Sequence, residues 1–163
     1  MAEQWKVEWF CRQAESQRQR MYALAVGILR NEADAQDAVQ NALLNAYAHL
    51  SQLRLTQRVK PWLMTIVTRE CYRILQQRHP QADVEQLSNM QSGSMDADVR
   101  LSLWDAVMTL DVPYRTVILL FYYEDMSIRQ IAKTLTLSED TVKKRLSRAR
   151  EKLRTSLEKE DFE

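Results

Sequence analysis

Apolar residues recur at steps of three and four along most of the chain, and no convincing alternation of apolar and polar positions appears. This spacing is typical of helices with one side facing a core. It predicts a short first helix or arm around Trp5, Trp9 and Phe10, and a second helix over 21–29, ending near Arg30. The third predicted helix has the clearest apolar stripe, formed by Val39, Ala42, Leu43, Ala46, Tyr47 and Leu50. A fourth begins at Pro61, where a missing N–H costs nothing, and its predicted buried residues are Trp62, Leu63, Ile66, Val67, Ile74 and Leu75.

The periodicity fails over 79–98, where Pro, Gly, Ser, Gln, Asn and Asp dominate, so this stretch is predicted to be a linker. Helical spacing resumes with Val99, Leu103, Val107 and Leu110. The segment 111–113 (DVP) predicts the end of one helix and the start of the next, and 114–123 is apolar enough to be a central helix. We therefore expect an all-α protein with two small helical domains, residues 1–78 and 99–163, joined by a flexible linker, 79–98.

The segment 127–150 predicts a helix-turn-helix within the second domain, which we expect to be a small bundle. Ser127 and Gln130 fit a capping box, and the Ser138 hydroxyl can cap the second helix. The turn often requires a residue that tolerates positive φ, usually Gly, whereas this chain has Thr136. The predicted inward residues are Ile128, Ile131, Ala132, Leu135, Leu137, Val142 and Leu146.

The charge distribution is more informative than the net charge of +1. Residues 141–154 contain seven Lys or Arg and one acid, whereas residues 80–111 contain six acids and one Arg. Such a cationic helix after a turn is the electrostatic footprint of a nucleic-acid surface. The alternative is that these cations only form a solvated face on a C-terminal helix without a DNA-binding role. The predicted helix caps and the small Ala132, where the two helices cross, favour DNA binding.

The second helix of this motif is expected to run from Glu139 to about Ser156 and to place its N-terminal turns in the major groove. Its cations suit guanine acceptors or phosphates. Around the capping Ser138, the residues expected to project outwards are Asp140, Thr141, Lys143, Lys144 and Ser147. Arg148 could reach a base edge or a phosphate, and the residues expected to hold the DNA backbone are Arg145, Arg150, Lys152 and Arg154.

Composition argues against several other classes. Cys11 and Cys71 stand alone without metal-ligand spacing, and His49 and His79 are isolated, so we expect no metal, no cofactor and no enzyme active site. Two Gly cannot form a Gly-rich phosphate loop, and no small-molecule substrate is expected. No apolar run approaches a membrane span and the first residues do not resemble a signal peptide, so we expect a cytoplasmic protein without membrane insertion.

Two parts of the chain resemble one family in the right order: the extracytoplasmic-function (ECF) sigma factors of bacterial RNA polymerase. Region two of that family is similar to about 18–78, through NEADAQDAVQNALL at 31–44 and WLMTI at 62–66. Region four is similar to 101–157, through LDVP at 110–113 and TVKKRLSRAR at 141–150. The resemblance implies a transcription initiation factor that binds core RNA polymerase and promoter DNA. Region four would read the upstream promoter element, and region two would bind core and open the downstream element.

The resemblance also implies roles for particular residues. An outward helix face matches the family's docking surface for a coiled coil of the core enzyme's largest subunit: Asp37, Gln40, Asn41 and Leu44. The segment 53–61 takes the place of the loop that captures an unstacked base of the downstream element, and its cations are Arg54, Arg58 and Lys60. The next helix carries rings and cations on one side: Trp62, Thr65, Arg69, Tyr72 and Arg73. The family often has Asn where Arg69 stands. The alternative is that Trp62 and Tyr72 are core residues, which is favoured for Trp62.

Members of the family are commonly held by a membrane-linked anti-sigma protein, so the resemblance implies such a partner for this chain. In the family the linker threads the RNA path of the polymerase, and the resemblance implies the same for residues 79–98. The alternative is that this linker is only a solvated tether. The main rival is a conventional helix-turn-helix regulator, which would bind duplex operator DNA by itself as a dimer. A third class is a decoy that binds core without reading DNA, and the basic helix argues against it.

Overall fold

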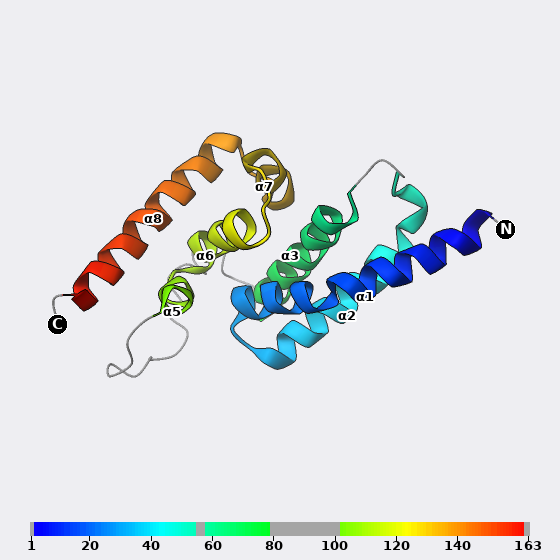
Figure 1. Cartoon of the computed structure of the whole chain (residues 1–163), viewed down its shortest axis with the longest axis horizontal. Helices are drawn as coiled ribbons and strands as arrows, with labels where there is room; N and C mark the ends of the chain where they lie inside the picture. Colours follow the sequence, from blue (N-terminus) through cyan, green and yellow to red (C-terminus); the bar gives the residue numbers. More distant parts are fainter. Residues whose placement is uncertain (1, 55–57, 79–101, 162–163) are drawn as a thin grey trace. The chain divides into compact units, whose positions relative to one another are not determined.

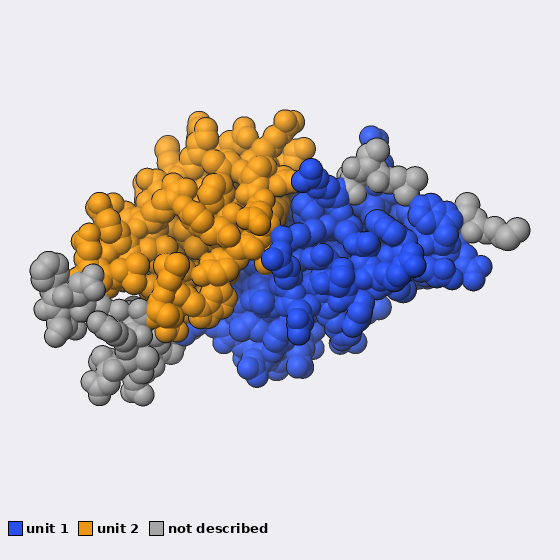
Figure 2. Space-filling view, in the orientation of Figure 1, with its two compact units in different colours: residues 1–75 blue, residues 76–163 orange. Residues whose placement is uncertain are grey.

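The structure, a computed structural model, describes residues 2–54, 58–78 and 102–161. Those residues form helices and their connections, and no strand occurs among them, which confirms the all-α expectation. The chain divides into two compact units, residues 1–75 and 76–163 (Figure 2). The predicted linker at 79–98 and Val99 lie outside the described residues, so the predicted domain boundaries stay a prediction.

Helix α1 is one continuous helix, Ala2–Leu29, so the expectation of a separate N-terminal arm is wrong. The polar stretch between Phe10 and Met21 contains no Gly or Pro that would break it. One side of α1 is buried at Phe10, Ala14, Met21, Leu24, Ala25 and Ile28, and between Ala14 and Met21 this side carries the half-buried Gln17. Burial of this stripe stabilises the helix through its polar middle.

A two-residue turn joins α1 to α2, Glu32–Ala48, and the two helices lie side by side (Figure 1). Arg30 ends α1 in the left-handed region, with φ 54°, and Asn31 caps α2 by accepting from the Asp34 N–H at 2.9 Å. The buried side of α2 is mostly small and consists of Asp34, Ala35, Ala38, Val39, Ala42 and Ala46. Small side chains let α1 and α2 approach closely, so this stripe is narrower than the predicted one: Leu43 is half-buried and Tyr47 is exposed.

A 3₁₀ turn, η1 (Leu50–Gln52), leads towards α3, Val59–Arg78, which starts two residues before Pro61 and keeps that proline in its first turn. The buried residues of α3 are Leu63, Met64, Val67, Thr68, Cys71 and Ile74. The predicted face was therefore shifted: Trp62, Ile66 and Leu75 are only half-buried. The buried Thr68 hydroxyl donates to the Met64 carbonyl oxygen at 2.7 Å, which satisfies its polar group within the helix.

After the residues that the structure leaves undescribed, the second unit contains α5, Leu103–Met108, and α6, Val112–Ile118. A capping box between Ser102 and Asp105 starts α5, and Asp111 and Pro113 mark the start of α6, as the sequence predicts. Of the apolar residues that marked the return of helical spacing, Val107 and Leu110 are buried, whereas Leu103 is 56% exposed. The centre of the unit continues from α6 into η2, a π-helix over Leu119–Tyr123, in which the Glu124 N–H donates to the Leu119 carbonyl oxygen at 3.1 Å.

Helices α7, Ile128–Leu135, and α8, Glu139–Asp161, form the predicted helix-turn-helix, and α8 packs on α5, α6 and α7 (Figure 1). Both capping predictions are confirmed: the Ser127–Gln130 box is present, and Ser138 Oγ accepts from the Thr141 N–H at 3.1 Å. Thr136 adopts the positive φ that the turn requires, 57°. The end of α8 lies five residues beyond the predicted Ser156.

Candidate nucleic-acid interface and docking surfaces

Helix α8 has one buried side and one solvent-exposed cationic side. Its buried residues follow steps of three and four: Val142, Leu146, Ala149 and Leu153. The residues between them are exposed at Asp140, Lys143, Lys144, Ser147 and Arg148, and half-buried at Thr141 and Arg145. The packed side fixes the helix on its unit, so the exposed side can present cations to a polyanion without rearrangement.

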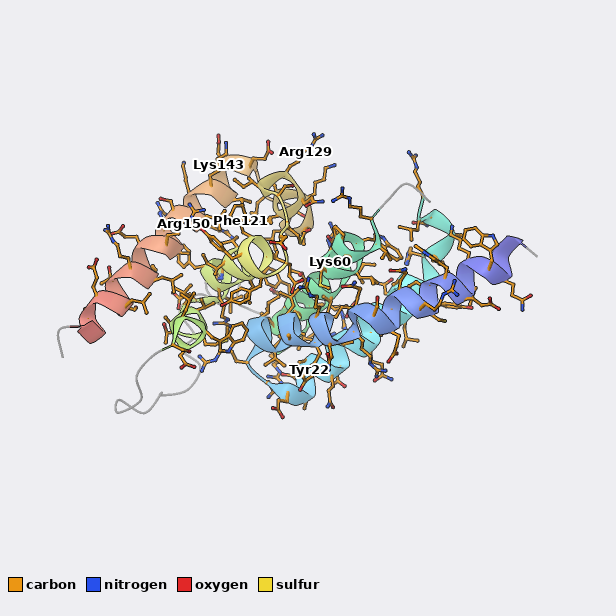
Figure 3. All side chains as sticks on the ribbon, in the orientation of Figure 1. Tyr22, Lys60, Phe121, Arg129, Lys143 and Arg150 are labelled. Carbon is orange, nitrogen blue, oxygen red and sulfur yellow. The ribbon has the colours of Figure 1, made fainter. Side chains whose placement is uncertain are left out.

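Among the predicted inward residues of the motif, Ile131, Ala132, Val142 and Leu146 are buried, whereas Ile128, Leu135 and Leu137 are half-buried. The sequence did not indicate that Thr134 is buried; its hydroxyl donates to the Gln130 carbonyl oxygen at 2.9 Å. The prediction also omitted Arg129, an exposed cation in the first turn of α7 (Figure 3). Because the first helix of such a motif crosses the DNA backbone, the place of Arg129 beside the capping Ser127 could have marked it.

The cations in the second half of α8 interact within the unit. The Arg150 Nε donates to the Tyr122 hydroxyl at 2.6 Å, and its guanidinium lies 5.8 Å from the centre of the Phe121 ring (Figure 3). Lys152 Nζ lies 5.0 Å from the centre of the Tyr114 ring. These cation–π contacts tie the second half of α8 to α6 and η2, whereas Lys143 and Lys144 are exposed near its start.

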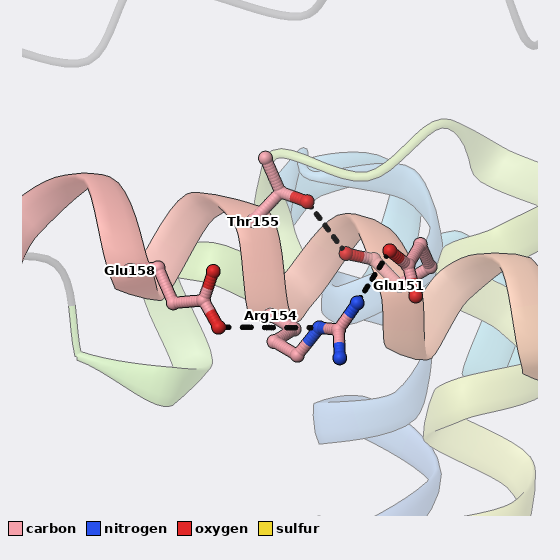
Figure 4. A network of polar contacts seen from close by, with 4 residues as sticks. All are labelled: Glu151, Arg154, Thr155 and Glu158. Atoms are coloured by element: carbon pink, nitrogen blue, oxygen red, sulfur yellow. Dashed lines mark hydrogen bonds and ion pairs between the residues drawn. The ribbon is translucent and has the colours of Figure 1, made fainter.

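Arg154 belongs to a surface network on α8 (Figure 4). Its Nη2 donates to Glu151 Oε1 at 2.7 Å, and its Nε lies 4.0 Å from Glu158 Oε1. The hydrogen bond and charge of Glu151 raise the pKa of Arg154, with a smaller effect from Glu158. Because these ion pairs are exposed, they contribute little to stability. The two carboxylates compensate part of the positive charge that Arg154 would offer to a phosphate.

The first unit has a groove between α1 and α2 beside the predicted core-docking face. Asp37, Gln40 and Leu44 are exposed, Leu44 to 63%, and Asn41 is half-buried. The groove has a volume of about 880 Å³, and Gln40 and Leu44 contribute to its lining. The other lining residues are Glu15, Ser16, Arg18, Gln19, Tyr22, Gln36, Val39 and Leu43. Leu43, expected in the core, is thus a wall of this groove, which mixes apolar and polar groups as a partner surface does.

The segment around the predicted strand-capturing loop is partly described, since residues 55–57 lie outside the described residues. Arg54 and Arg58 are exposed and Lys60 is half-buried. Along α3, Arg69 and Arg73 are exposed while Trp62, Thr65 and Tyr72 are half-buried. Arg73 Nε forms an ion pair with Glu70 Oε2 at 2.9 Å. The Trp62 ring packs edge-on against the Phe10 ring, with 6.5 Å between the ring centres, so Trp62 belongs partly to the core.

Within the described part of the chain, no group of three or more His, Cys, Asp or Glu residues could hold a metal ion. Cys71 is buried, and desolvation, with a smaller effect from Glu70, raises the pKa of its thiol. None of the described helices combines the length and apolarity that crossing a bilayer requires.

Comparison with known proteins agrees with this layout. The chain matches two family models, sigma-70 region 2 over residues 14–80 and sigma-70 region 4 over residues 100–153. It is 31% identical over 147 residues to the RNA polymerase sigma factor SigV of Bacillus subtilis, with 89% of each chain covered. The ECF RNA polymerase sigma factor SigW of the same organism is 28% identical over 155 residues, covering 85% of this chain and 83% of SigW.

The fold is similar to that of the sigma factor RpoE from Bartonella quintana, solved in complex with the anti-sigma factor NepR. The TM-score is 0.72 at 23% sequence identity, over 91% of this chain and 96% of that one. A helical unit with the region-two pattern followed by a region-four helix-turn-helix defines a sigma-70-type initiation factor. The chain belongs to this family, within its ECF group. The family consists of non-catalytic transcription initiation factors, and this chain is therefore an initiation factor that directs core RNA polymerase to promoters; the conventional-regulator alternative finds no support.

Proposed function

We propose that the two units divide promoter recognition at the level of particular side chains. Helix α8 reads the upstream element with the exposed residues of its first half. The α1–α2 groove and the adjacent face of α2 dock on a helical element of core polymerase. The segment 53–61 and the exposed side of α3 capture the displaced strand of the downstream element.

The upstream role rests on one observation: the exposed cations in the first half of α8 stand opposite its buried stripe. Lys143, Lys144 and Arg148 are solvent-exposed, while Val142 and Leu146 fix the orientation of the helix. A rigid helix with Lys or Arg near its N-terminus suits the O6 and N7 acceptors of guanine in the major groove. Farther along, Arg150 and Lys152 are braced by rings, so they suit phosphates better than base edges.

The direct test is run-off transcription with purified core polymerase over a library of promoters, which also identifies the preferred sequence. We expect weak duplex binding by the protein alone and promoter-specific transcripts once core is added. Tight, sequence-specific binding of the isolated protein to a palindrome, as a dimer, would instead favour the conventional regulator.

The docking role rests on an exposed leucine beside a groove. Leu44 presents apolar surface at the edge of the α1–α2 groove, with Asp37 and Gln40 around it. An apolar anchor within a polar rim is typical of a site that binds an amphipathic helix. Asp37→Lys should weaken association with core at least several-fold, without changing the DNA affinity of the second unit. Glu8→Lys is the matched control, since Glu8 is also exposed and lies outside the groove; equal affinities for both variants would remove Asp37 from the docking surface.

The downstream role rests on exposed cations beside half-buried rings. Arg54 and Arg58 flank the segment, and Trp62 and Tyr72 keep part of their rings accessible on α3. Cations neutralise the backbone of a single strand, while rings stack on its bases. Binding of a single-stranded downstream-element oligonucleotide by the holoenzyme tests this role, and Arg58→Ala should reduce it.

Two further expectations follow from this role. A factor that acts on RNA polymerase works in the cytoplasm. The exposed groove and the cationic face are also surfaces that an anti-sigma protein could cover, so we propose that such a partner competes with core; competition between core and a candidate partner for the α1–α2 groove would test it.

A further inference from the structure

The first turns of α1, residues 4–10, contact Leu53, the first residue of the segment 53–61, and Trp62, the residue that follows the segment. On one side, Lys6 Nζ donates to the Leu53 carbonyl oxygen at 3.0 Å, immediately before Arg54. On the other side, Phe10 packs edge-on against the ring of Trp62 at 6.5 Å. The match to sigma-70 region 2 starts at residue 14, so both contacts come from residues outside that match.

Phe10 is the apolar part of this arrangement. It is 4% exposed, and it is the buried member of residues 4–10. Besides Trp62, it contacts the ring of Tyr47 at 6.2 Å. Since Tyr47 lies near the end of α2 and Trp62 in the first turns of α3, one side chain holds together the two helices that the segment connects.

Lys6 is the polar part. The Leu53 residue is 4% exposed and ends the 3₁₀ turn η1, and its carbonyl oxygen has a charged donor from a residue 47 positions earlier. A charge-assisted hydrogen bond of this kind is stronger than a neutral one. It fixes the point at which the chain leaves the packed unit and enters the cation-bearing segment. Holding Leu53 and Trp62 in place lowers the conformational freedom of the neighbouring Arg54 and of the first turn of α3 that strand binding must remove.

We propose that residues 4–10 of α1 are a positioning element for the strand-capturing segment, with Lys6 and Phe10 as the positioning residues. The proposal rests on the downstream role assigned above to that segment. Neither residue needs to touch DNA; each acts by holding Arg54 and Arg58 where a displaced strand can meet them.

The test uses the complete factor bound to core polymerase. The variant Lys6→Met keeps the aliphatic stem and loses the donor. We expect it to bind a single-stranded downstream-element oligonucleotide roughly 3- to 10-fold more weakly, and to open a duplex promoter correspondingly less. Arg12→Met is the control, because it removes an exposed cation from the same helix without a bond to Leu53.

A direct contact between Lys6 and phosphate is separated from positioning by two further measurements. Phe10→Leu carries no charge change, so a similar loss in that variant, with thermal unfolding measured alongside, supports positioning. In the double variant Lys6→Met/Arg54→Ala, positioning predicts that the Lys6 effect shrinks, because Lys6 holds Leu53 and thereby the neighbouring Arg54; additive losses would assign Lys6 an independent contact and overturn the proposal.

The outcomes also separate this inference from the proposed function. If Arg58→Ala leaves oligonucleotide binding unchanged, the strand-capturing role itself is wrong. If Arg58→Ala weakens binding but Lys6→Met and Phe10→Leu do not, the segment captures the strand without help from α1, and only the positioning role is overturned. Rescue of Lys6→Met binding by Lys6→Arg, which restores a donor, supports it.

Discussion

Thr136 gives the sharpest test of the local physics of the helix-turn-helix. It is a β-branched residue with φ 57° and ψ 51°, at the end of α7. The Leu137 N–H donates to the Ala132 carbonyl oxygen at 2.9 Å, and the Thr136 N–H donates to the Lys133 carbonyl oxygen at 3.4 Å. This is the hydrogen-bond pattern of a Schellman cap, in which Gly is the usual residue at the left-handed position.

The size of the effect of Thr136→Gly follows from two opposing contributions. A left-handed conformation costs a residue with a Cβ about 1–2 kcal/mol, and glycine removes this cost. Glycine also gains freedom in the unfolded chain, which costs about 0.5–1 kcal/mol. Thr136 is exposed, so little packing is lost. We expect the unit to become more stable by about 0.5–1 kcal/mol.

The control is the same replacement at Thr155, an exposed residue inside α8. There the backbone is helical and the hydroxyl donates to the Glu151 carbonyl oxygen at 3.0 Å, so Thr155→Gly should destabilise the unit by about 0.3–0.5 kcal/mol. Because the chain has two compact units, a single unfolding free energy is not well defined. Hydrogen exchange of the buried Leu146 and Ala149 amides measures the second unit alone. We expect Thr136→Gly to raise the stability of the second unit and Thr155→Gly to lower it. If both variants lower the stability, strain at Thr136 in its left-handed conformation is refuted.

Three further predictions concern α8 and the core of the first unit. Lys144→Ala should change the preferred upstream sequence, whereas Lys152→Ala should weaken all sequences alike and lower the salt dependence of binding; equal effects in a promoter-library assay would refute this division. Leu146→Ala should destabilise the second unit by about 2–5 kcal/mol in hydrogen exchange, because it leaves a cavity under α8, and a loss below 1 kcal/mol would contradict the packing. Burial and, to a smaller extent, Glu70 raise the pKa of Cys71, so its contribution to stability is present below the ordinary thiol pKa and is lost as the pH rises above about 8.5. Urea unfolding of the first unit, followed between pH 7 and 10 by a probe placed in that unit, should show this decline, and its absence in Cys71→Ala is the check.

The features that could be predicted from sequence are those set by neighbouring residues. The caps at Ser127 and Ser138 depend on groups within three residues, and the structure contains both. The end of one helix and the start of the next at 111–113 also depend on neighbouring residues, since Asp111 and Pro113 suit the start of a helix. The cationic side of α8 followed from the same periodicity that gave its buried side.

The errors come from packing between distant elements. The predicted stripe on the third helix counted Leu43 and Tyr47 because they are apolar, whereas the close approach of α1 selects the alanines. Arg115 is 4% exposed and donates to the Leu110 carbonyl oxygen at 2.6 Å, which no periodicity indicates for an arginine. At the candidate sites, spacing could place cations on one face, but not the hydrogen bond between Arg150 and Tyr122, 28 residues apart.

The π-helix over Leu119–Tyr123 makes the second unit unequally tolerant of insertions and deletions. A π-turn contains one residue more than an α-turn, so loss of one residue there could restore an ordinary helix and preserve the fold. The same deletion would also change the direction of Tyr122 within the turn, because successive side chains in a π-turn are separated by less than the roughly 100° of an α-helix, and the Tyr122 hydroxyl now accepts from Arg150. A chain shortened at this point would thus still fold, yet lose the brace on the distal half of its recognition helix.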